Sequence, residues 1–217
     1  MSRNHVIGKR GRLPWSIPED FAYFLESVKG DVCITGRKCY AELGSAIPGS
    51  GLHIVLSTQG ITYPDAVVRP SLDAAMQAAR THGRDVANVW ICGGTSVYRE
   101  SFPIAEEFWA TLVHADVDGD VYFPHNWQQH FPVEVSRRRS SDENYRYDFV
   151  IYRSRPTAHR KVKLLGLLGL CLDICKFLDI GVCATAAPRE KETRKQPWGV
   201  IITSCCGCCR PLFVESS

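Results

Sequence analysis

One acidic side chain, Asp20, stands among residues that could form a small-molecule site. It lies in the first turns of a predicted helix over residues 18–28, beside the aromatic residues Trp15, Phe21 and Phe24. A carboxylate in apolar surroundings is costly unless a cation or a set of hydrogen-bond donors partners it. The segment therefore predicts either a carboxylate with a donor-rich partner or an acid that caps the helix or lies in solvent, because first helical turns favour acids.

Two segments further along have the composition of an anion-binding site. Residues 35–38 (Thr-Gly-Arg-Lys) bring two cations to a predicted helix start, where backbone N–H groups favour phosphate. Residues 91–98 run from a strand through the pair Gly93 and Gly94 into a helix, and glycine lets a backbone approach a pyrophosphate closely. A solvated basic turn is the alternative for the first segment. Neither segment is the G-x-G-x-x-G fingerprint, so the ordinary dinucleotide-binding fold is not indicated.

Two other segments have residues that could bind metal but lack the spacing. The acidic run at residues 116–120 has no glutamate at the position that closes a calcium loop, so we expect no metal site there. The cysteines of residues 205–209 could hold a metal or carry acyl chains. Their spacing is not a standard zinc pattern.

The elements that must position these residues alternate between strands and helices. Helices are predicted over residues 18–28, 37–43, 71–82 and 95–101, and strands over residues 31–35, 52–56, 66–68, 89–92, 107–113, 131–135 and 145–152. Alternation up to residue 113, followed by hairpin-like strands, indicates an α/β sheet with an antiparallel end.

Composition and charge divide the chain near residue 156. The 217 residues are 45% hydrophobic and 23% charged, which excludes collagen-like, wholly disordered and multi-span membrane proteins. Residues 1–155 carry 17 Lys and Arg against 18 Asp and Glu, whereas residues 156–217 carry 9 against 5. The net charge of +3 is too small to indicate nucleic acid as a partner. No secretory signal precedes residue 20, so we expect a cytoplasmic protein, with organellar targeting left open if the N-terminus is truncated.

Residues 156–217 form a basic, Cys-rich extension. Seven of the ten cysteines lie in it. The apolar run at residues 164–172 is too short to cross a membrane. We expect an extension of unknown structure that is largely disordered, appended to a domain over residues 1–155.

In their order along the chain, the segments of residues 3–155 resemble the dihydrofolate reductase family. The matching stretches are residues 6–8, 13–15, 18–20, 36–37, 56–57, 93–94, 97–98, 111, 119–120 and 123–124, and residues 145–153 resemble the closing strand. The resemblance implies a three-layer α/β fold with a central mixed β-sheet and flanking helices. It also implies that the family's first strand is missing here, and that Gly93 and Gly94 are joined by a cis peptide.

The resemblance implies the reduction of 7,8-dihydrofolate to 5,6,7,8-tetrahydrofolate with NADPH, in support of one-carbon and thymidylate metabolism. It assigns Asp20, which would pair with the pterin ring N–H and amino group, and Trp15 and Leu13 of a mobile loop to catalysis. The substrate residues that it implies are Asp20, Phe21, Phe24, Leu43, Ile47 and Thr111, with the Thr111 hydroxyl supporting the carboxylate. The cofactor residues that it implies are Ile7, Gly8, Gly11, Arg12, Gly36, Arg37, Lys38, Cys39, Ser57, Thr58, Cys92, Gly93, Gly94, Thr95, Ser96, Val97 and Tyr98.

The chain departs from the family pattern in two side chains as well as in the first strand. An arginine that clamps the glutamate of folate is expected after Gly49, where Ser50 stands instead. Cys39 replaces a threonine on the phosphate side. These departures leave open a catalytically impaired homologue that binds pterin or NADPH, beside a pteridine or riboflavin-pathway reductase and a membrane-surface protein directed by the extension. We expect a monomer.

Overall fold

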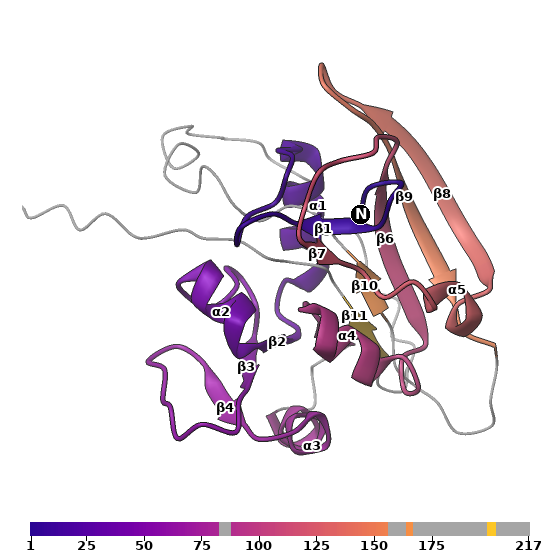
Figure 1. The fold of residues 1–217 in the computed structure, drawn as a ribbon. Helices are drawn as coiled ribbons and strands as arrows, with labels where there is room; N and C mark the ends of the chain where they lie inside the picture. The colour runs from indigo at the N-terminus through magenta and orange to yellow at the C-terminus, as the bar shows by residue number, and fades with distance from the viewer. Residues whose placement is uncertain (83–87, 156–163, 167–198, 203–217) are drawn as a thin grey trace, which may run out of the picture.

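The computed structural model describes residues 1–82, 88–155, 164–166 and 199–202 (Figure 1). The helices in these residues are α1 (Pro18–Val28), α2 (Arg37–Leu43), α3 (Leu72–His82), α4 (Thr95–Ser101) and α5 (Trp127–His130). The strands are β1 (Val6–Gly8), β2 (Val32–Gly36), β3 (Leu52–Leu56), β4 (Val67–Arg69), β5 (Asn88–Ile91), β6 (Glu107–Val113), β7 (Val121–Tyr122), β8 (Val133–Ser141), β9 (Arg146–Arg153), β10 (Leu164–Gly166) and β11 (Gly199–Ile202).

The main sheet is mixed, as the sequence predicts. Its strand order is β4-β3-β2-β5-β11-β6-β9-β8, and β10 also pairs with β6. The pairs from β4 to β6 are parallel, whereas β6, β9 and β8 pair in antiparallel fashion. A separate two-stranded sheet joins β1 to β7.

Apolar residues on both faces of the inner strands produce the three layers. Val32 and Ile34 of β2 belong to the hydrophobic cluster that includes residues of α3 and α4. Cys33, between them, belongs to a second cluster with Phe24 and Val28 of α1. Because successive strand residues point to opposite faces, the helices of the two clusters cover opposite faces of the sheet.

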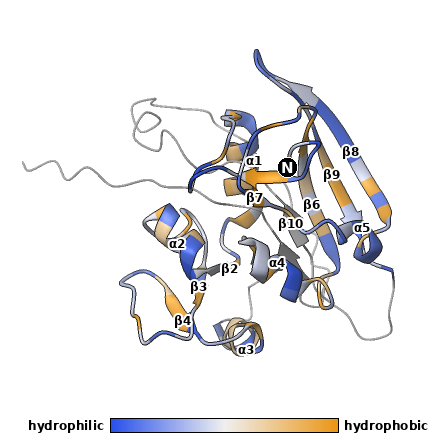
Figure 2. Cartoon of the chain, viewed as in Figure 1, coloured by the Kyte–Doolittle hydropathy of each residue, from blue (hydrophilic) through white to orange (hydrophobic). Residues whose placement is uncertain are grey.

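Most predicted elements are present, and the exceptions have physical reasons. The strand expected at residues 131–135 is instead β8, which extends to Ser141. Eight of its nine residues are exposed, and Figure 2 shows the strand as mainly hydrophilic. Its extended form therefore depends on pairing with β9 rather than on apolar alternation. β1, β7 and α5 were not predicted because two to four residues are too few to show a period.

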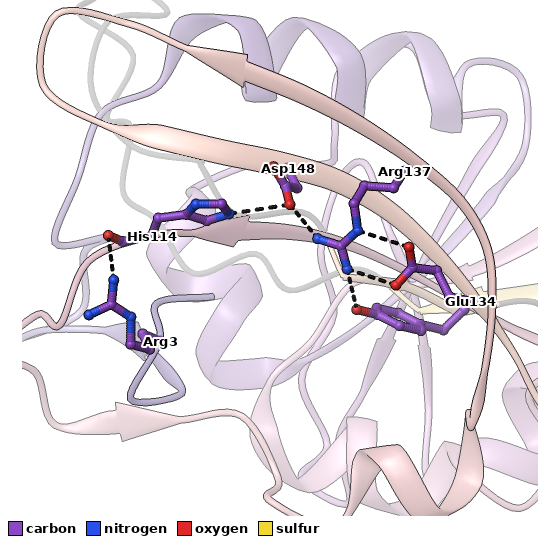
Figure 3. A network of polar contacts seen from close by, with 6 residues as sticks. Arg3, His114, Glu134, Arg137 and Asp148 are labelled. Carbon is purple, nitrogen blue, oxygen red and sulfur yellow. Dashed lines mark hydrogen bonds and ion pairs between the residues drawn. The ribbon is translucent and has the colours of Figure 1, made fainter.

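A charged network fastens this edge strand to the sheet (Figure 3). Arg137 of β8 binds both carboxylate oxygens of Glu134, at 2.8 and 2.7 Å, and also the buried carboxylate of Asp148 on β9. His114, which follows β6, lies 3.3 Å from Asp148 through Nε2. Arg3 donates to the carbonyl of His114 at 3.1 Å. The hydrogen bond to Glu134 raises the pKa of Arg137, so the cation is held firmly between two acids.

The inner edge of β6 is paired by three short segments instead of one strand. β11 lies between β5 and β6, where Ile201 is in register with both Trp90 and Glu107. β10 pairs with the next part of β6, at 108–110. Met1 continues the edge: the amide of Val113 donates to its carbonyl at 2.9 Å. Backbone from residues 1–2, 164–166 and 199–202 thus satisfies the edge next to β5.

The extension therefore contributes two backbone segments to the main sheet. Its remaining residues, including the cysteines of 205–209 and the rest of the apolar run, lie outside the described residues, as does the expectation that the extension is largely disordered.

Replacing Ile201 by proline in the full chain should destabilise the protein. Proline removes an amide donor from the centre of a parallel sheet and is excluded from such strands. We expect a fall in the free energy of unfolding of at least about 1 kcal/mol, the scale of one ladder hydrogen bond, and slow hydrogen exchange at the amides of 199–202 in the parent. Ile201→Val is the matched control and should behave like the parent. Equal melting of the proline and valine variants, or exchange of these amides at the unprotected rate, would contradict the assignment.

Candidate active site

The carboxylate of Asp20 is buried inside the protein. Its residue is 0% exposed, although it stands in the first turn of α1. The helix begins after Ile17 without a side-chain cap, so Asp20 neither caps the helix nor lies in solvent. The hydroxyl of Thr111 on β6 donates to Asp20 Oδ1 at 2.6 Å. This contact joins α1 to the centre of the sheet and orients the carboxylate.

The N-terminal amino group lies within electrostatic range of this carboxylate. The α-amino group of Met1 donates to the carbonyl of Thr111 at 2.5 Å. Burial holds the pKa of that amino group well below its ordinary value, while the charge of Asp20 acts in the opposite direction. Leu13 and Trp15, in the segment before α1, are buried. The indole Nε1 of Trp15 is buried with no hydrogen-bond partner among the described residues.

The expected apolar substrate wall is assembled in one place. Phe24, Leu43 and Ile47 are buried in the same cluster, and Phe21 packs against it half-buried. The cluster lies on the α1 side of the sheet, which is the side of Asp20. Ser50, found in place of the expected arginine, donates its hydroxyl to the carbonyl of Ile47 at 2.7 Å. The side chain at this position therefore stabilises the turn and offers no cation to a ligand.

Two glycine-containing loops meet at the carboxyl ends of β2 and β5. The amide of Gly36 donates to the carbonyl of Gly93 at 2.6 Å, and the peptide between Gly93 and Gly94 is cis, as the resemblance implies. A Cβ on Gly94 would come within 3.1 Å of the Cys39 sulfur, and one on Gly36 within 3.2 Å of a Val97 methyl. Only glycine permits this approach without displacement of a neighbour.

The same loops present donors suited to a phosphorylated ligand. Helices α2 and α4 begin there without side-chain caps, so their first N–H groups need other partners. Arg37 is half-buried, and Lys38 and Ser96 are exposed. Ser57 and Thr58, after β3, line a cavity of about 510 Å³ together with Arg69. A dinucleotide with an added phosphate fits this donor set, because cations and hydroxyls stand together beside a close-approach backbone.

Some of the residues expected to bind the cofactor support the loops from the core instead of lying at the surface. Cys39, Cys92, Val97 and Tyr98 are buried and support the two loops from beneath. The hydroxyl of Thr95 donates to the carbonyl of Tyr122 at 2.9 Å. Ile7 and Gly8 lie buried in β1, which pairs with β7. These expected cofactor positions shape the loops, and all of them except the half-buried Thr95 are buried.

The loop that carries Gly11 and Arg12 is tied to the segment before β7. Asp120 accepts the amide of Arg10 at 3.0 and 3.1 Å through its two carboxylate oxygens. Lys9 lies 2.8 Å from Asp118 and lowers the pKa of that carboxyl. These contacts hold residues 9–10 of the loop against residues 118–120.

Sequence reasoning assigned no role to a buried histidine between the two halves of the site. His53 on β3 contacts both Thr35 and Ile47 through its ring nitrogens. Its one signal in the sequence is a polar residue within the apolar strand 52–56.

Comparisons with known proteins show the family of the chain. The family model described as dihydrofolate reductase matches residues 1–154. The chain belongs to the dihydrofolate reductase family. It is 32% identical over 146 residues to dihydrofolate reductase from Haemophilus influenzae, covering 67% of this chain and 88% of that protein. It is 36% identical over 154 residues to the enzyme from Neisseria meningitidis serogroup B, covering 70% and 92%.

A solved structure has the same fold. Dihydrofolate reductase from Enterococcus faecalis, complexed with NADP(H) and RAB-propyl, superposes with a TM-score of 0.63 at 26% identity. The match covers 72% of this chain and 93% of that one. The three-layer fold expected from the family resemblance is thereby confirmed.

Two other kinds of site were sought in the described residues. Among them, no three or more His, Cys, Asp or Glu side chains gather in a way that could hold a metal ion. No helix in the same part of the chain is long and apolar enough to span a membrane.

Replacing Thr111 by valine should weaken both stability and activity. The change removes the donor to a buried carboxylate, and hydrogen bonds to charged groups contribute about 1.5–3 kcal/mol. We expect a lower melting temperature and a lower turnover number, measured by thermal unfolding and NADPH oxidation. Thr111→Ser keeps the hydroxyl and should recover most of both quantities. If the serine variant were as impaired as the valine variant, the loss of stability and activity could not be due to the missing hydroxyl.

Proposed function

We propose that Asp20 is the acidic residue that binds the pterin in the reaction of this chain. As a member of its family, the chain reduces 7,8-dihydrofolate to 5,6,7,8-tetrahydrofolate with NADPH, which makes it an oxidoreductase that supplies one-carbon metabolism. The observation that carries the assignment is the buried carboxylate of Asp20, oriented by Thr111 at 2.6 Å beside an apolar wall. A pterin brings a ring N–H and an amino group, the donors that a buried carboxylate requires.

The apolar wall and the carboxylate would bind different parts of the substrate. Phe21, Phe24, Leu43 and Ile47 would hold the flat and apolar parts of the substrate and exclude water. Asp20 would hold the pterin edge and favour a proton at the ring nitrogen that becomes basic as hydride arrives. The proton would come through water, and the buried Nε1 of Trp15 is a donor that could hold such a water near the ring.

The glycine loops would hold NADPH. Gly93, Gly94 and the start of α4 would take the pyrophosphate, and Arg37, Lys38, Ser57 and Thr58 the adenosine side with its added phosphate. When bound, the cofactor supplies the hydride. The chain's own part is to fix the cofactor and close Leu13 and Trp15 over it, a movement of the kind that can gate turnover.

The remaining assignments follow the same proposal. Residues 1–155 would supply the catalytic and binding side chains of the domain, whose sheet β10 and β11 complete. The protein would act as a monomer in the cytoplasm on a small-molecule substrate, without nucleic acid or membrane as a partner. A catalytically impaired binding homologue is the second candidate, since Ser50 provides no clamp for the glutamate of folate. Reduction of dihydrofolate by the purified full chain decides between the two.

Asp20→Asn should reduce the turnover number for dihydrofolate by orders of magnitude at pH 7. The amide keeps the shape of the side chain but removes the charge that favours a protonated pterin. The loss should shrink as the pH falls, because the substrate then protonates without help. The measurement is NADPH oxidation across pH, with Glu19→Gln as the control. Glu19 is the adjacent acid, but it binds Arg138 at 2.6 Å and faces away from the pocket toward β8. Full activity of Asp20→Asn at pH 7 would remove Asp20 from this role.

NADPH should bind more tightly than NADH, by about 1–3 kcal/mol, the scale of charge-assisted hydrogen bonds. The reason is the pair of cations at residues 37–38, which only the phosphorylated cofactor engages. Titration of each cofactor by fluorescence measures both dissociation constants. In Arg37→Gln the dissociation constant for NADPH should rise while that for NADH stays the same, so the preference for NADPH over NADH should become smaller. Equal dissociation constants for NADPH and NADH in the parent would refute the proposal that residues 37–38 bind the added phosphate.

A further inference from the structure

We propose that His53 is a positioning residue that couples the substrate wall to the cofactor loop, and that it acts as the neutral imidazole with its hydrogen on Nε2. The proposal rests on the proposed function for the identity of the two ligands. It concerns the connection between their sites, not the chemistry at Asp20.

The hydrogen bonds of His53 fix its tautomer. The backbone amide of Ile47 donates to Nδ1 at 3.0 Å, so Nδ1 carries no hydrogen. A neutral imidazole then has its hydrogen on Nε2. Nε2 lies 2.8 Å from the hydroxyl oxygen of Thr35, which accepts that hydrogen. Both ring nitrogens are satisfied, each by a different segment of the chain.

The two partners belong to opposite halves of the site. Ile47 is part of the apolar wall with Phe24 and Leu43. Thr35 directly precedes Gly36, whose amide bonds to Gly93 of the cofactor loop at 2.6 Å. His53, on β3, therefore links a residue of the apolar wall to the residue before the cofactor loop.

The surroundings of His53 keep it neutral. The residue is 2% exposed. Burial lowers the pKa of His53 to about 4, against the opposing charge of Asp65. Tyr40 of α2 packs edge-on against the imidazole at 5.4 Å and donates to Asp65, and Tyr63 lies against Tyr40 at 4.1 Å. These are the ionisable groups of the described residues that α2 and the loop after β3 bring toward it, and none of them neutralises an imidazolium directly.

Two amide substitutions separate the two contacts of His53. In asparagine, the side-chain oxygen occupies the place of Nδ1 and can accept from Ile47, but nothing reaches Thr35. In glutamine, the side-chain nitrogen occupies the place of Nε2 and can donate to Thr35, but the acceptor for Ile47 is lost. A residue that only fills core volume would not divide its effects in this way.

The experiment measures dissociation constants and Michaelis constants for both ligands in the full chain. His53→Asn should raise the dissociation constant for NADPH about three- to tenfold, the scale of one hydrogen bond, and leave the Michaelis constant for dihydrofolate within about twofold. His53→Gln should do the reverse. Thr35→Val, which removes the same cofactor-side contact from its other end, should match His53→Asn, and adding it to His53→Asn should have little further effect.

The pH dependence of melting gives a second measurement. An unfolded histidine takes up a proton below about pH 6.5, whereas the folded residue resists protonation down to about pH 4. The unfolded state therefore binds more protons in this interval, and the parent should lose stability as the pH falls through it. Both amide variants should lose less over the same interval.

The proposal would be overturned if the NADPH dissociation constant and the dihydrofolate Michaelis constant rose together, in proportion to the loss of melting temperature. That result is expected of a residue that only fills core volume. If an amide variant does not fold, Thr35→Val decides the cofactor-side contact, and an unchanged NADPH constant overturns it. The outcome is separable from the proposed function. A parent that binds NADPH but does not reduce dihydrofolate would refute the function, while the NADPH constants would still test His53.

Discussion

The buried carboxylate of Asp20 is the constraint on which the site depends. A charge at this depth requires donors, and one of them is the hydroxyl of Thr111, which lies 91 positions away in the chain. The helix that carries the carboxylate and the strand that carries the hydroxyl must therefore keep a fixed separation. That separation is maintained by the packing of Phe24 and Val28 against the sheet. When α1 packs onto the sheet, the same contacts also place and orient the Asp20 carboxylate for a ligand.

The second half of the site depends on backbone instead of charge. Gly36 and Gly93 bring the ends of two adjacent parallel strands to 2.6 Å between donor and acceptor. Two helices, α2 and α4, start at this point without side-chain caps for their first N–H groups. Side chains that the family resemblance assigns to the cofactor, such as Tyr98 and Cys92, hold this backbone in place from the core. His53 lies between the charge-based and the backbone-based halves.

The sequence predicts the order of the elements well, because the inner strands and α1 carry long apolar patterns. It predicts the segments that meet at the site only through the family resemblance, since Asp20 and Thr111 have no local signal that they touch. Other features are set by tertiary pairing alone. β8 is a strand because β9 offers it a partner, and its row of arginines shows no strand period. The tautomer of His53 follows from the positions of Ile47 and Thr35, which no spacing in the sequence reveals.

The position of β11 has a consequence for how the chain folds. Its partners β5 and β6 are synthesised well before it, so the middle of the sheet cannot close until residues 199–202 have been made. Pairing between segments so distant in sequence raises the contact order, and high contact order slows folding. Until then β5 and the beginning of β6 lack this pairing partner, and unpaired strand edges favour association with other chains. The nascent protein therefore has an interval of exposure during translation, and its length is set by the rate at which the ribosome reaches the last described strand.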